Sequence, residues 1–277
     1  MRWRTDGSSK DHGIGRRLRV TARRRKLDAM NDMKNDAKAS APTARAPVSG
    51  EFPKRLINGY EAFLNGRFSA EQQRYRLLAE MGQKPRTMVI GCCDSRVSPE
   101  VIFDAGPGEL FVVRNVANLT PPYAPNDDYH GTSAALEFAV MALRVEHIVV
   151  LGHGQCGGVR AYIENERDPY MRPLSPGDFI GKWIRLIQPA HERTPADTDE
   201  DIGDYLERLA HESIKQSIAN LRTFPCVKTL EERGLLALHG AYFSVMDGRL
   251  LTLDPATGKF DAVGAAAHAA AFAEPRF

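Results

Sequence analysis

Two thiols and one imidazole stand in two short motifs that could meet at a single metal ion. Cys92 begins the sequence Cys-Cys-Asp-Ser-Arg, and His153 and Cys156 belong to Gly-His-Gly-Gln-Cys-Gly-Gly. Two thiolates and an imidazole suit Zn²⁺, which takes three protein ligands in catalytic sites and keeps a fourth position open. Asp94 and Arg96 follow Cys92 closely enough to pair with each other beside such an ion.

Either motif alone is weak evidence for a metal site. Two cysteines that follow a strand often serve only as small buried residues in the core, and an isolated His-x-x-Cys motif often binds no metal. Together the two motifs favour a metal centre. A closed structural or storage zinc module and a redox pair of Cys92 and Cys156 remain as alternatives. The neighbouring Asp94 and Arg96 argue against both, because a closed site has no use for an ion pair beside an open position.

Each motif directly follows a run of apolar, β-branched residues. The runs at 87–90 and 147–151 show no alternation of apolar and polar residues, which is typical of parallel strands buried on both faces. In an open α/β sheet, ligands bind at the carboxyl ends of the strands. The two motifs are therefore expected at one edge of one sheet.

The remaining elements follow from periodicity and turn signals. Ser69 and Gln72 fit a capping box at the start of a helix, and Asp247-Gly248 is a hairpin signal. The expected fold is α/β, with a mostly parallel central sheet, one antiparallel edge strand and flanking helices. Helices are predicted at 52–66, 69–81, 99–103, 132–143, 157–163, 179–187 and 202–221, and further strands at 110–114, 235–245 and 250–253.

The length and cysteine content bound the class of protein. The chain has 277 residues, enough for one large α/β domain, and no apolar run reaches the length of a membrane helix. Four cysteines, two of them adjacent, suit reduced thiols in the cytoplasm better than a secreted disulfide framework. A cytoplasmic protein without a membrane partner is expected.

Charge divides the chain unevenly. The first 30 residues carry ten Lys and Arg against three Asp and Glu, whereas the remaining residues have a net charge of −5. The acidic remainder gives no reason to expect nucleic acid as a partner, and a basic run is more often solvated or disordered than a binding arm. We expect a disordered basic extension at 1–50, a zinc domain at 51–260 and an Ala-rich tail at 261–277.

The combined motifs resemble the beta-class carbonic anhydrases, in particular their plant-like branch. The resemblance runs from about residue 52 to about residue 253 and includes the stretches 92–96, 107–118, 130–140 and 153–158. It implies a zinc lyase that interconverts CO₂ and bicarbonate through a hydroxide on one Zn²⁺ per subunit. Cys92, His153 and Cys156 would bind zinc, Asp94 would orient the hydroxide and Arg96 would orient Asp94. A relative that hydrolyses CS₂ or COS at the same site is an alternative.

The resemblance also makes Asp94 a potential fourth metal ligand. In some members of the family this aspartate leaves its arginine and closes the site on zinc. We expect the open state here, because Gln83 is plant-like and because Val89 stands where the switching branch carries Trp.

By the same resemblance, several residues would form the substrate pocket. Gln83 would hydrogen-bond the substrate from a dimer interface, Phe111, Val116 and Phe138 would line an apolar wall, and the Gly157 N–H would face bicarbonate. Ordinary core packing is an equally good explanation of the three apolar side chains. Plant enzymes carry Tyr in place of Phe138, so a phenolic hydrogen bond is missing. A homodimer is the least assembly implied, with N-terminal helices extending to the partner, and a homotetramer is equally allowed.

Overall fold

The computed structural model describes residue 48 and residues 50–168 and 170–264. Most of the predicted basic extension and most of the Ala-rich tail lie outside these residues. The chain forms two compact units, Met1–Phe63 and Leu64–Phe277. The described part of the first unit contains one helix, α2 (Lys54–Phe63), in which no residue is buried. The predicted domain boundaries at 50 and 260 stay predictions.

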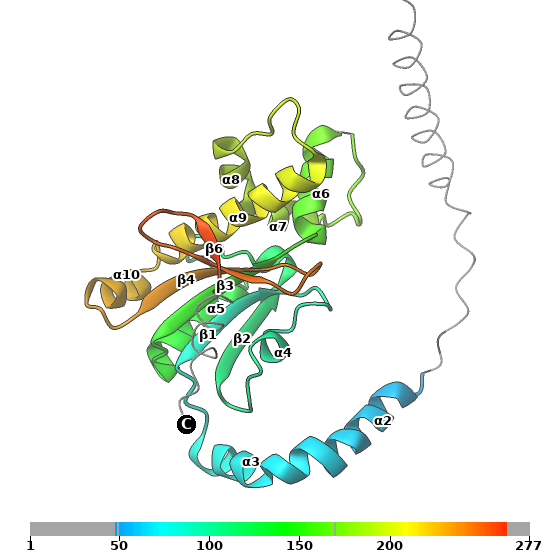
Figure 1. The fold of residues 1–277 in the computed structure, drawn as a ribbon, viewed down its shortest axis with the longest axis vertical. Coiled ribbons are helices and arrows are strands. Elements are labelled where there is room, and N and C mark those ends of the chain that lie inside the picture. The colour runs from blue at the N-terminus through cyan, green and yellow to red at the C-terminus, as the bar shows by residue number, and fades with distance from the viewer. Residues whose placement is uncertain (1–47, 49, 169, 265–277) are drawn as a thin grey trace, which may run out of the picture. The chain divides into compact units, whose positions relative to one another are not determined.

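The second unit is built on one six-stranded sheet with the order β2-β1-β3-β4-β5-β6 (Figure 1). The first four of these strands are parallel, and β5 and β6 run antiparallel to their neighbours. The predicted fold is confirmed, and β6 adds a second antiparallel strand at the edge. The bounds are β1 Thr87–Cys92, β2 Leu110–Asn115, β3 His147–His153, β4 Ala237–Phe243, β5 Leu250–Leu253 and β6 Phe260–Ala262.

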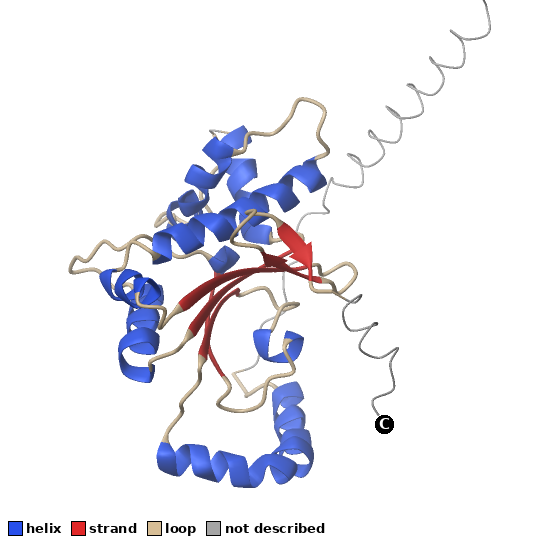
Figure 2. Ribbon diagram, turned by 60° about the vertical axis from the view of Figure 1, so that its left-hand side comes forward, coloured by secondary structure: helices blue, strands red, loops and turns tan. Residues whose placement is uncertain are grey.

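Helices cover the two faces of the sheet unequally. In Figure 2 a group of helices lies on one face, while the short α4 lies on the other. The long helix α9 packs against β3 and β4. The helices of this unit are α3 Ser69–Met81, α4 Pro99–Ile102, α5 Gly131–Glu137, α6 Gly157–Arg167, α7 Phe179–Ile184, α8 Gln188–Arg193, α9 Ile202–Leu221 and α10 Pro225–Glu232, with π-helical or 3-10 turns η1 Leu64–Phe68, η2 Val116–Asn118, η3 Phe138–Leu143 and η4 Arg185–Ile187.

Both faces of the central strands are buried, which is why their sequences do not alternate. Met88 and Ile90 contribute to the main core beneath the helices. Val89, between them, points to the opposite face and packs in a smaller cluster with Leu151 and Ala241. Because β1 has 0% exposure at all three of these positions, polar side chains can occur only at its ends.

The capping prediction at Ser69 is wrong. Phe68, which precedes it, has helical dihedral angles (φ −62°, ψ −41°), and η1 continues directly into α3. The backbone donors at the start of α3 therefore face a preceding helical turn and need no side-chain cap. Two helices, α8 and α10, were not predicted; each carries proline in its first turn, a position that proline favours.

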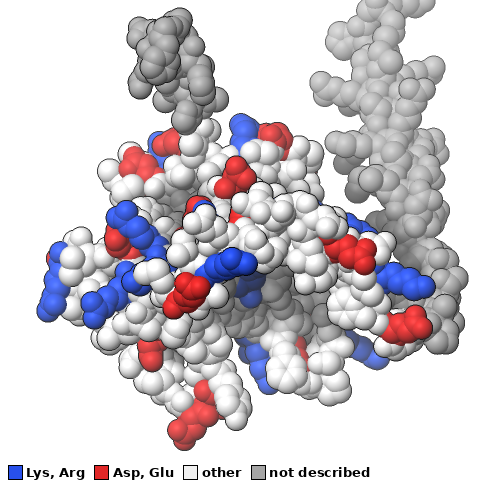
Figure 3. Space-filling model, turned by 90° about the horizontal axis from the view of Figure 1, so that it is seen from below, with Lys and Arg blue, Asp and Glu red and all other residues white. Residues whose placement is uncertain are grey.

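Charged side chains are mixed over the visible surface. On the face shown in Figure 3, Lys and Arg alternate with Asp and Glu and do not gather by sign. Ion pairs among the described residues include Arg74–Glu109 (2.8 Å) and Arg222–Glu231 (2.8 Å). Among the described residues, no helix combines the length and the apolar character that crossing a bilayer requires.

Candidate metal centre

Cys92, His153 and Cys156 converge at the carboxyl edge of the sheet. Cys92 ends β1, His153 ends β3, and Cys156 precedes α6. Their ligand atoms lie within 4.8 Å of one another, and the residues are only 5%, 1% and 6% exposed. Because β1 and β3 are paired in parallel register, they end side by side. The convergence predicted from the two motifs is confirmed.

The imidazole of His153 is oriented as a metal ligand. Its Nδ1 lies 2.8 Å from the carbonyl oxygen of Gly154, so the ring donates its proton there and leaves the lone pair on Nε2. Nε2 is buried and has no hydrogen-bond partner among the described residues. A buried nitrogen without a partner costs about 1–3 kcal/mol, and a metal ion beside two thiolates would satisfy it.

Backbone donors favour the thiolate forms of both cysteines. The N–H of Ala117, a residue with left-handed φ of 64°, donates to Cys92 Sγ at 3.3 Å. A hydrogen bond from Cys156 lowers the pKa of the Cys92 thiol against the opposing effect of burial. The pKa of the Cys156 thiol is raised, chiefly by its hydrogen bond to Cys92 and by burial, and the first-turn N–H groups of Val159 and Gly158 oppose that rise. Thiolates are the form in which cysteine binds metals.

Asp94 and Arg96 form a bidentate ion pair beside this cluster. Arg96 Nε is 2.9 Å from Asp94 Oδ1, and Arg96 Nη2 is 2.6 Å from Oδ2. This pairing holds the pKa of the Asp94 carboxyl well below its usual range. Oδ2 lies 3.9 Å from His153 Nε2, and Asp94 does not belong to the three-residue ligand group. Arg96 also donates to the carbonyl oxygen of Gln155 at 3.1 Å, which connects the two motifs.

Arg114 supports the metal loop and was not singled out from the sequence. Its Nε donates to the carbonyl oxygen of Cys92 at 2.8 Å, and its Nη2 donates to that of Asp94 at 2.7 Å. In the sheet, Arg114 pairs with Gly91, one residue before the ligand. Its position, a charged residue at the end of an apolar strand, is the feature of the sequence that could have indicated its supporting role.

The predicted pocket residues separate into two groups within one chain. In the first group, Gly157 follows Cys156, and Val116 lies against Gly158. A Cβ atom added at Gly158 would stand only 2.9 Å from Val116 Cγ1. The rings of Phe111 and Phe138 contact each other, with centroids 5.9 Å apart.

The second group stands away from the metal ligands. Phe111 pairs with Met88, four residues before Cys92, which corresponds to about 13 Å along the strand. Gln83 is exposed in the turn that precedes β1. One copy of the chain therefore does not bring Gln83, Phe111 and Phe138 to its own metal cluster.

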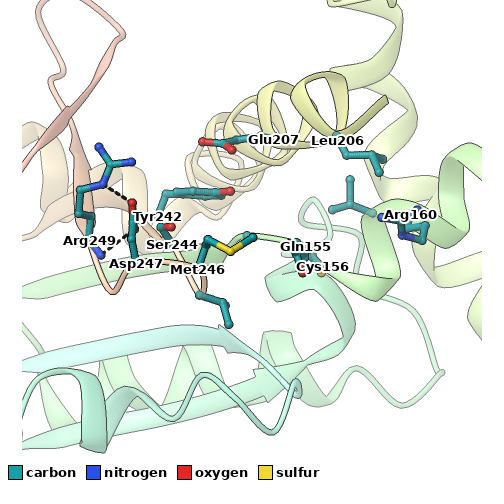
Figure 4. Close-up of a pocket in the computed structure, with 14 residues that line it drawn as sticks. Gln155, Cys156, Arg160, Leu206, Glu207, Tyr242, Ser244, Met246, Asp247 and Arg249 are labelled. Atoms are coloured by element: carbon teal, nitrogen blue, oxygen red, sulfur yellow. Dashed lines mark hydrogen bonds and ion pairs between the residues drawn. The ribbon is translucent and has the colours of Figure 1, made fainter. Parts of the chain in front are cut away.

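Two cavities flank the metal loop. One, of about 580 Å³, is mostly apolar and is lined by Cys93, Val116, Ile180 and Trp183, among others. Trp183 donates from Nε1 to the carbonyl oxygen of Val116 at 2.7 Å and so fixes this wall. The other cavity, of about 300 Å³, lies beside Cys156 and Gln155 and is closed by Tyr242 and the β4–β5 turn (Figure 4).

Comparisons with known proteins agree on one family. Residues 87–250 match the family described as Carbonic anhydrase. A carbonic anhydrase of Pseudomonas aeruginosa is 35% identical over 205 residues, which cover 74% of this chain and 89% of that protein. Beta carbonic anhydrase 6, mitochondrial, of Arabidopsis thaliana is 33% identical over 203 residues, covering 72% of this chain and 67% of the relative.

Solved structures are similar over most of their length. The beta-carbonic anhydrase CcaA has a TM-score of 0.65 at 30% identity, covering 77% of this chain and 92% of that one. One of two tetrameric beta-carbonic anhydrases of Sordaria macrospora has a TM-score of 0.59 at 26% identity, covering 76% and 96%. With this agreement in sequence and in fold, and with a buried Cys-His-Cys cluster at the expected edge, the chain belongs to the beta-class carbonic anhydrases.

Proposed function

We propose that Cys92, His153 and Cys156 hold the zinc with which this lyase interconverts CO₂ and bicarbonate. The observation that carries the assignment is the buried Nε2 of His153, which has no hydrogen-bond partner among the described residues and lies within 4.8 Å of two sulfurs. Zinc, when bound, supplies the Lewis acid that lowers the pKa of water from about 15.7 to about 7. The residues around the cluster determine where the resulting nucleophile points.

Asp94 orients the attacking oxygen. Its carboxylate is ionised, because Arg96 lowers its pKa, so it can accept a hydrogen bond and cannot donate one. By accepting a hydrogen bond from the hydroxyl group of the nucleophile, Asp94 would turn a lone pair of that oxygen towards CO₂. This help matters because two thiolates cancel the charge of Zn²⁺ and make it a weaker Lewis acid than three neutral imidazoles would.

Arg96 keeps Asp94 away from the metal. The guanidinium engages both carboxylate oxygens, and the backbone N–H of Arg96 also donates to Oδ1 at 3.0 Å. A bidentate pair of this kind has a planar geometry that lysine cannot reproduce. We infer that the open arrangement is the resting one. Val89 also supports this inference, because it stands where the switching branch of the family carries Trp.

The apolar cavity beside the metal loop provides the surface for CO₂. Val116 and Trp183 line it, and the Nε1–carbonyl bond between them leaves no unsatisfied indole N–H. An apolar wall favours CO₂ over water next to the nucleophile. The Gly157 N–H, at the start of α6, faces the side where bicarbonate forms.

A second copy of the chain completes the site in this proposal. Within one copy, Gln83 precedes β1, Phe111 lies near the start of β2 and Phe138 contacts Phe111, so in this proposal they serve the site of a partner. The exposed apolar residues of α2, Leu56 (57%) and Tyr60 (59%), suit a helix that docks on that partner. We infer a homodimer at least, and a homotetramer is compatible with it.

The four cysteines, Cys92, Cys93, Cys156 and Cys226, are all free. Reduced thiols support a cytoplasmic site of action, and cell fractionation tests it.

Hydrolysis of CS₂ or COS would need the same residues, and the family assignment favours CO₂.

Stopped-flow CO₂ hydration, measured before and after zinc is removed with a chelator and then restored, tests the proposed function. Loss and recovery of the rate in step with the zinc content are expected. A rate that survives complete removal of zinc would contradict it, and measured COS turnover without CO₂ hydration would establish the alternative.

A further inference from the structure

Two histidines lie side by side at the end of the sheet opposite to the metal cluster. Nδ1 of His147 is 3.1 Å from Nε2 of His239, and the ring centroids are 5.2 Å apart. His147 begins β3, the strand that His153 ends, so the two sites are about 20 Å apart along that strand. The histidine pair is therefore separate from the catalytic centre.

The strands hold the two rings together. In the parallel ladder between β3 and β4, His147 is level with Ala237 and His239 is level with Val149. Side chains two residues apart on a strand point to the same face, so His147 and Val149 share a face. The rings thus meet across neighbouring strands at a fixed diagonal, on the face that carries the small cluster of Val89, Leu151 and Ala241.

The distance between the two nitrogens fits a shared metal ion. Two imidazole nitrogens that each bind Zn²⁺ at about 2.0–2.1 Å, with an angle between octahedral and tetrahedral values, are about 2.8–3.4 Å apart. The observed 3.1 Å lies within this range. The pair needs little rearrangement beyond a swing of the rings to bring both lone pairs onto one ion.

Both rings can stay neutral when a cation binds between them. In the structure, one ring donates a hydrogen bond to the other through the facing nitrogens, His147 Nδ1 and His239 Nε2. The outer nitrogens, His147 Nε2 and His239 Nδ1, have no hydrogen-bond partner among the described residues, and both side chains are exposed. Each ring can therefore carry its proton on the outer nitrogen and present the inner one to a cation.

The surroundings favour the neutral form of His239. Partial burial, and then the proximity of His147, lower the pKa of His239, which favours its neutral form. Glu146, whose charge acts on His147, is itself paired with Arg86. Neutral imidazole is the form that binds transition metals.

We propose that His147 and His239 form a second metal site on each subunit, one that takes a divalent d-block cation such as Zn²⁺, Ni²⁺ or Cu²⁺. Imidazole suits these ions, whereas Mg²⁺ and Ca²⁺ prefer oxygen ligands. Water fills the remaining coordination positions at this exposed site. The proposal stands apart from the catalytic roles given above and does not depend on them.

Zinc titration of the holoenzyme tests this site. Full-length protein with one zinc per subunit is titrated with Zn²⁺ by isothermal calorimetry, and elemental analysis after gel filtration counts the metal retained. The wild type is expected to bind one further equivalent per subunit. His147→Ala and His239→Ala should each abolish this equivalent, and the double variant should lose no more than either single variant.

Matched variants make the result decisive. His130→Ala removes another exposed histidine, one bonded to Asn126 at 2.6 Å, and should keep the further equivalent. His147→Phe preserves the ring volume without its nitrogens, in case alanine destabilises the strand, and thermal melting checks that each variant is folded. A wild type that binds no further zinc, or folded His147 and His239 variants that bind it as the wild type does, would overturn the proposal.

Discussion

Arg96 engages both carboxylate oxygens of Asp94, at 2.9 Å through Nε and at 2.6 Å through Nη2, and the same guanidinium reaches the carbonyl oxygen of Gln155. One side chain thus ties the motif at the end of β1 to the motif at the end of β3. Asp94 stays 3.9 Å from His153 Nε2 in this arrangement. The open metal position in our proposal depends on this pair.

Replacement of Arg96 by lysine should lower the rate of CO₂ hydration about 10- to 100-fold, because a charged hydrogen bond contributes about 1.5–3 kcal/mol and a tenfold rate change corresponds to about 1.36 kcal/mol. Lysine retains the charge but not the fork that holds both oxygens. Stopped-flow kinetics at saturating CO₂ measure the effect, and the zinc content should not change. A rate within twofold of the wild type would show that the bidentate pair is dispensable.

Replacement of Arg114 by methionine should weaken zinc binding although no metal ligand is replaced. Its two hydrogen bonds fix the carbonyl groups of Cys92 and Asp94, and loss of such supporting contacts typically lowers metal affinity about 10- to 100-fold. Competition with a chromophoric chelator measures this affinity. Arg233→Met, at an exposed position after α10, is the control and should keep wild-type affinity. Equal zinc retention by both variants would remove this role of Arg114.

The close packing of α9 against β3, the strand that ends at His153, predicts that a larger residue at Gly152 destabilises the fold. A Cβ at Gly152 would stand 2.6 Å from Ile214 Cδ1, and Ile214 is 0% exposed. Gly152→Ala should therefore lower the free energy of unfolding by about 1–3 kcal/mol through overpacking. Adding Ile214→Val removes the clashing methyl group and should restore part of the loss. Chemical denaturation measures both, and a double variant less stable than Gly152→Ala alone would argue against the predicted contact.

His211 makes stability fall at acid pH. Burial, followed by the charge of Lys215, lowers its pKa from 6.5 to about 4, and its ring stacks on Phe260 at 4.4 Å. The unfolded chain takes up the proton first as pH falls, so the contribution is complete above about pH 6.5 and is lost towards pH 4.

His211→Phe keeps the stacking and removes this titration. The wild type should lose at most about 2 kcal/mol more than the variant between pH 7 and pH 5, and less to the extent that solvent reaches the ring. Thermal melting at the two pH values measures the difference. Parallel pH profiles for the two proteins would contradict the assignment to His211.

Elements with a clear periodicity in the sequence were predicted correctly, whereas a very short strand and a helix start that depends on its neighbouring turn were not. The long amphipathic stretch Ile202–Leu221 forms α9 within the predicted bounds, and the buried runs before Cys92 and His153 form adjacent parallel strands. The strand β6 has three residues, too few for any periodicity to register. Ser69 and Gln72 carry a capping signal, yet the turn η1 continues into α3 and makes the cap unnecessary.

The supporting residues of the site depend on tertiary contacts. Trp183 lies 67 residues from the carbonyl group that it binds at Val116, and no short-range pattern connects the two. Arg114 reaches the metal loop only because β2 lies beside β1. The metal ligands, by contrast, stand at or just after the ends of strands. Neighbouring parallel strands end at the same edge of the sheet, so these ligands come together independently of how the helices pack.

Zinc K-edge X-ray absorption, recorded on protein with one zinc per subunit, tests the central claim most directly. The proposal predicts a first shell with two sulfurs at about 2.3 Å and lighter nitrogen or oxygen ligands at about 2.0–2.1 Å. Cys92→Ser should reduce the sulfur count by one if the variant retains zinc. A first shell of nitrogen and oxygen alone would contradict the assignment of Cys92, His153 and Cys156 to the metal.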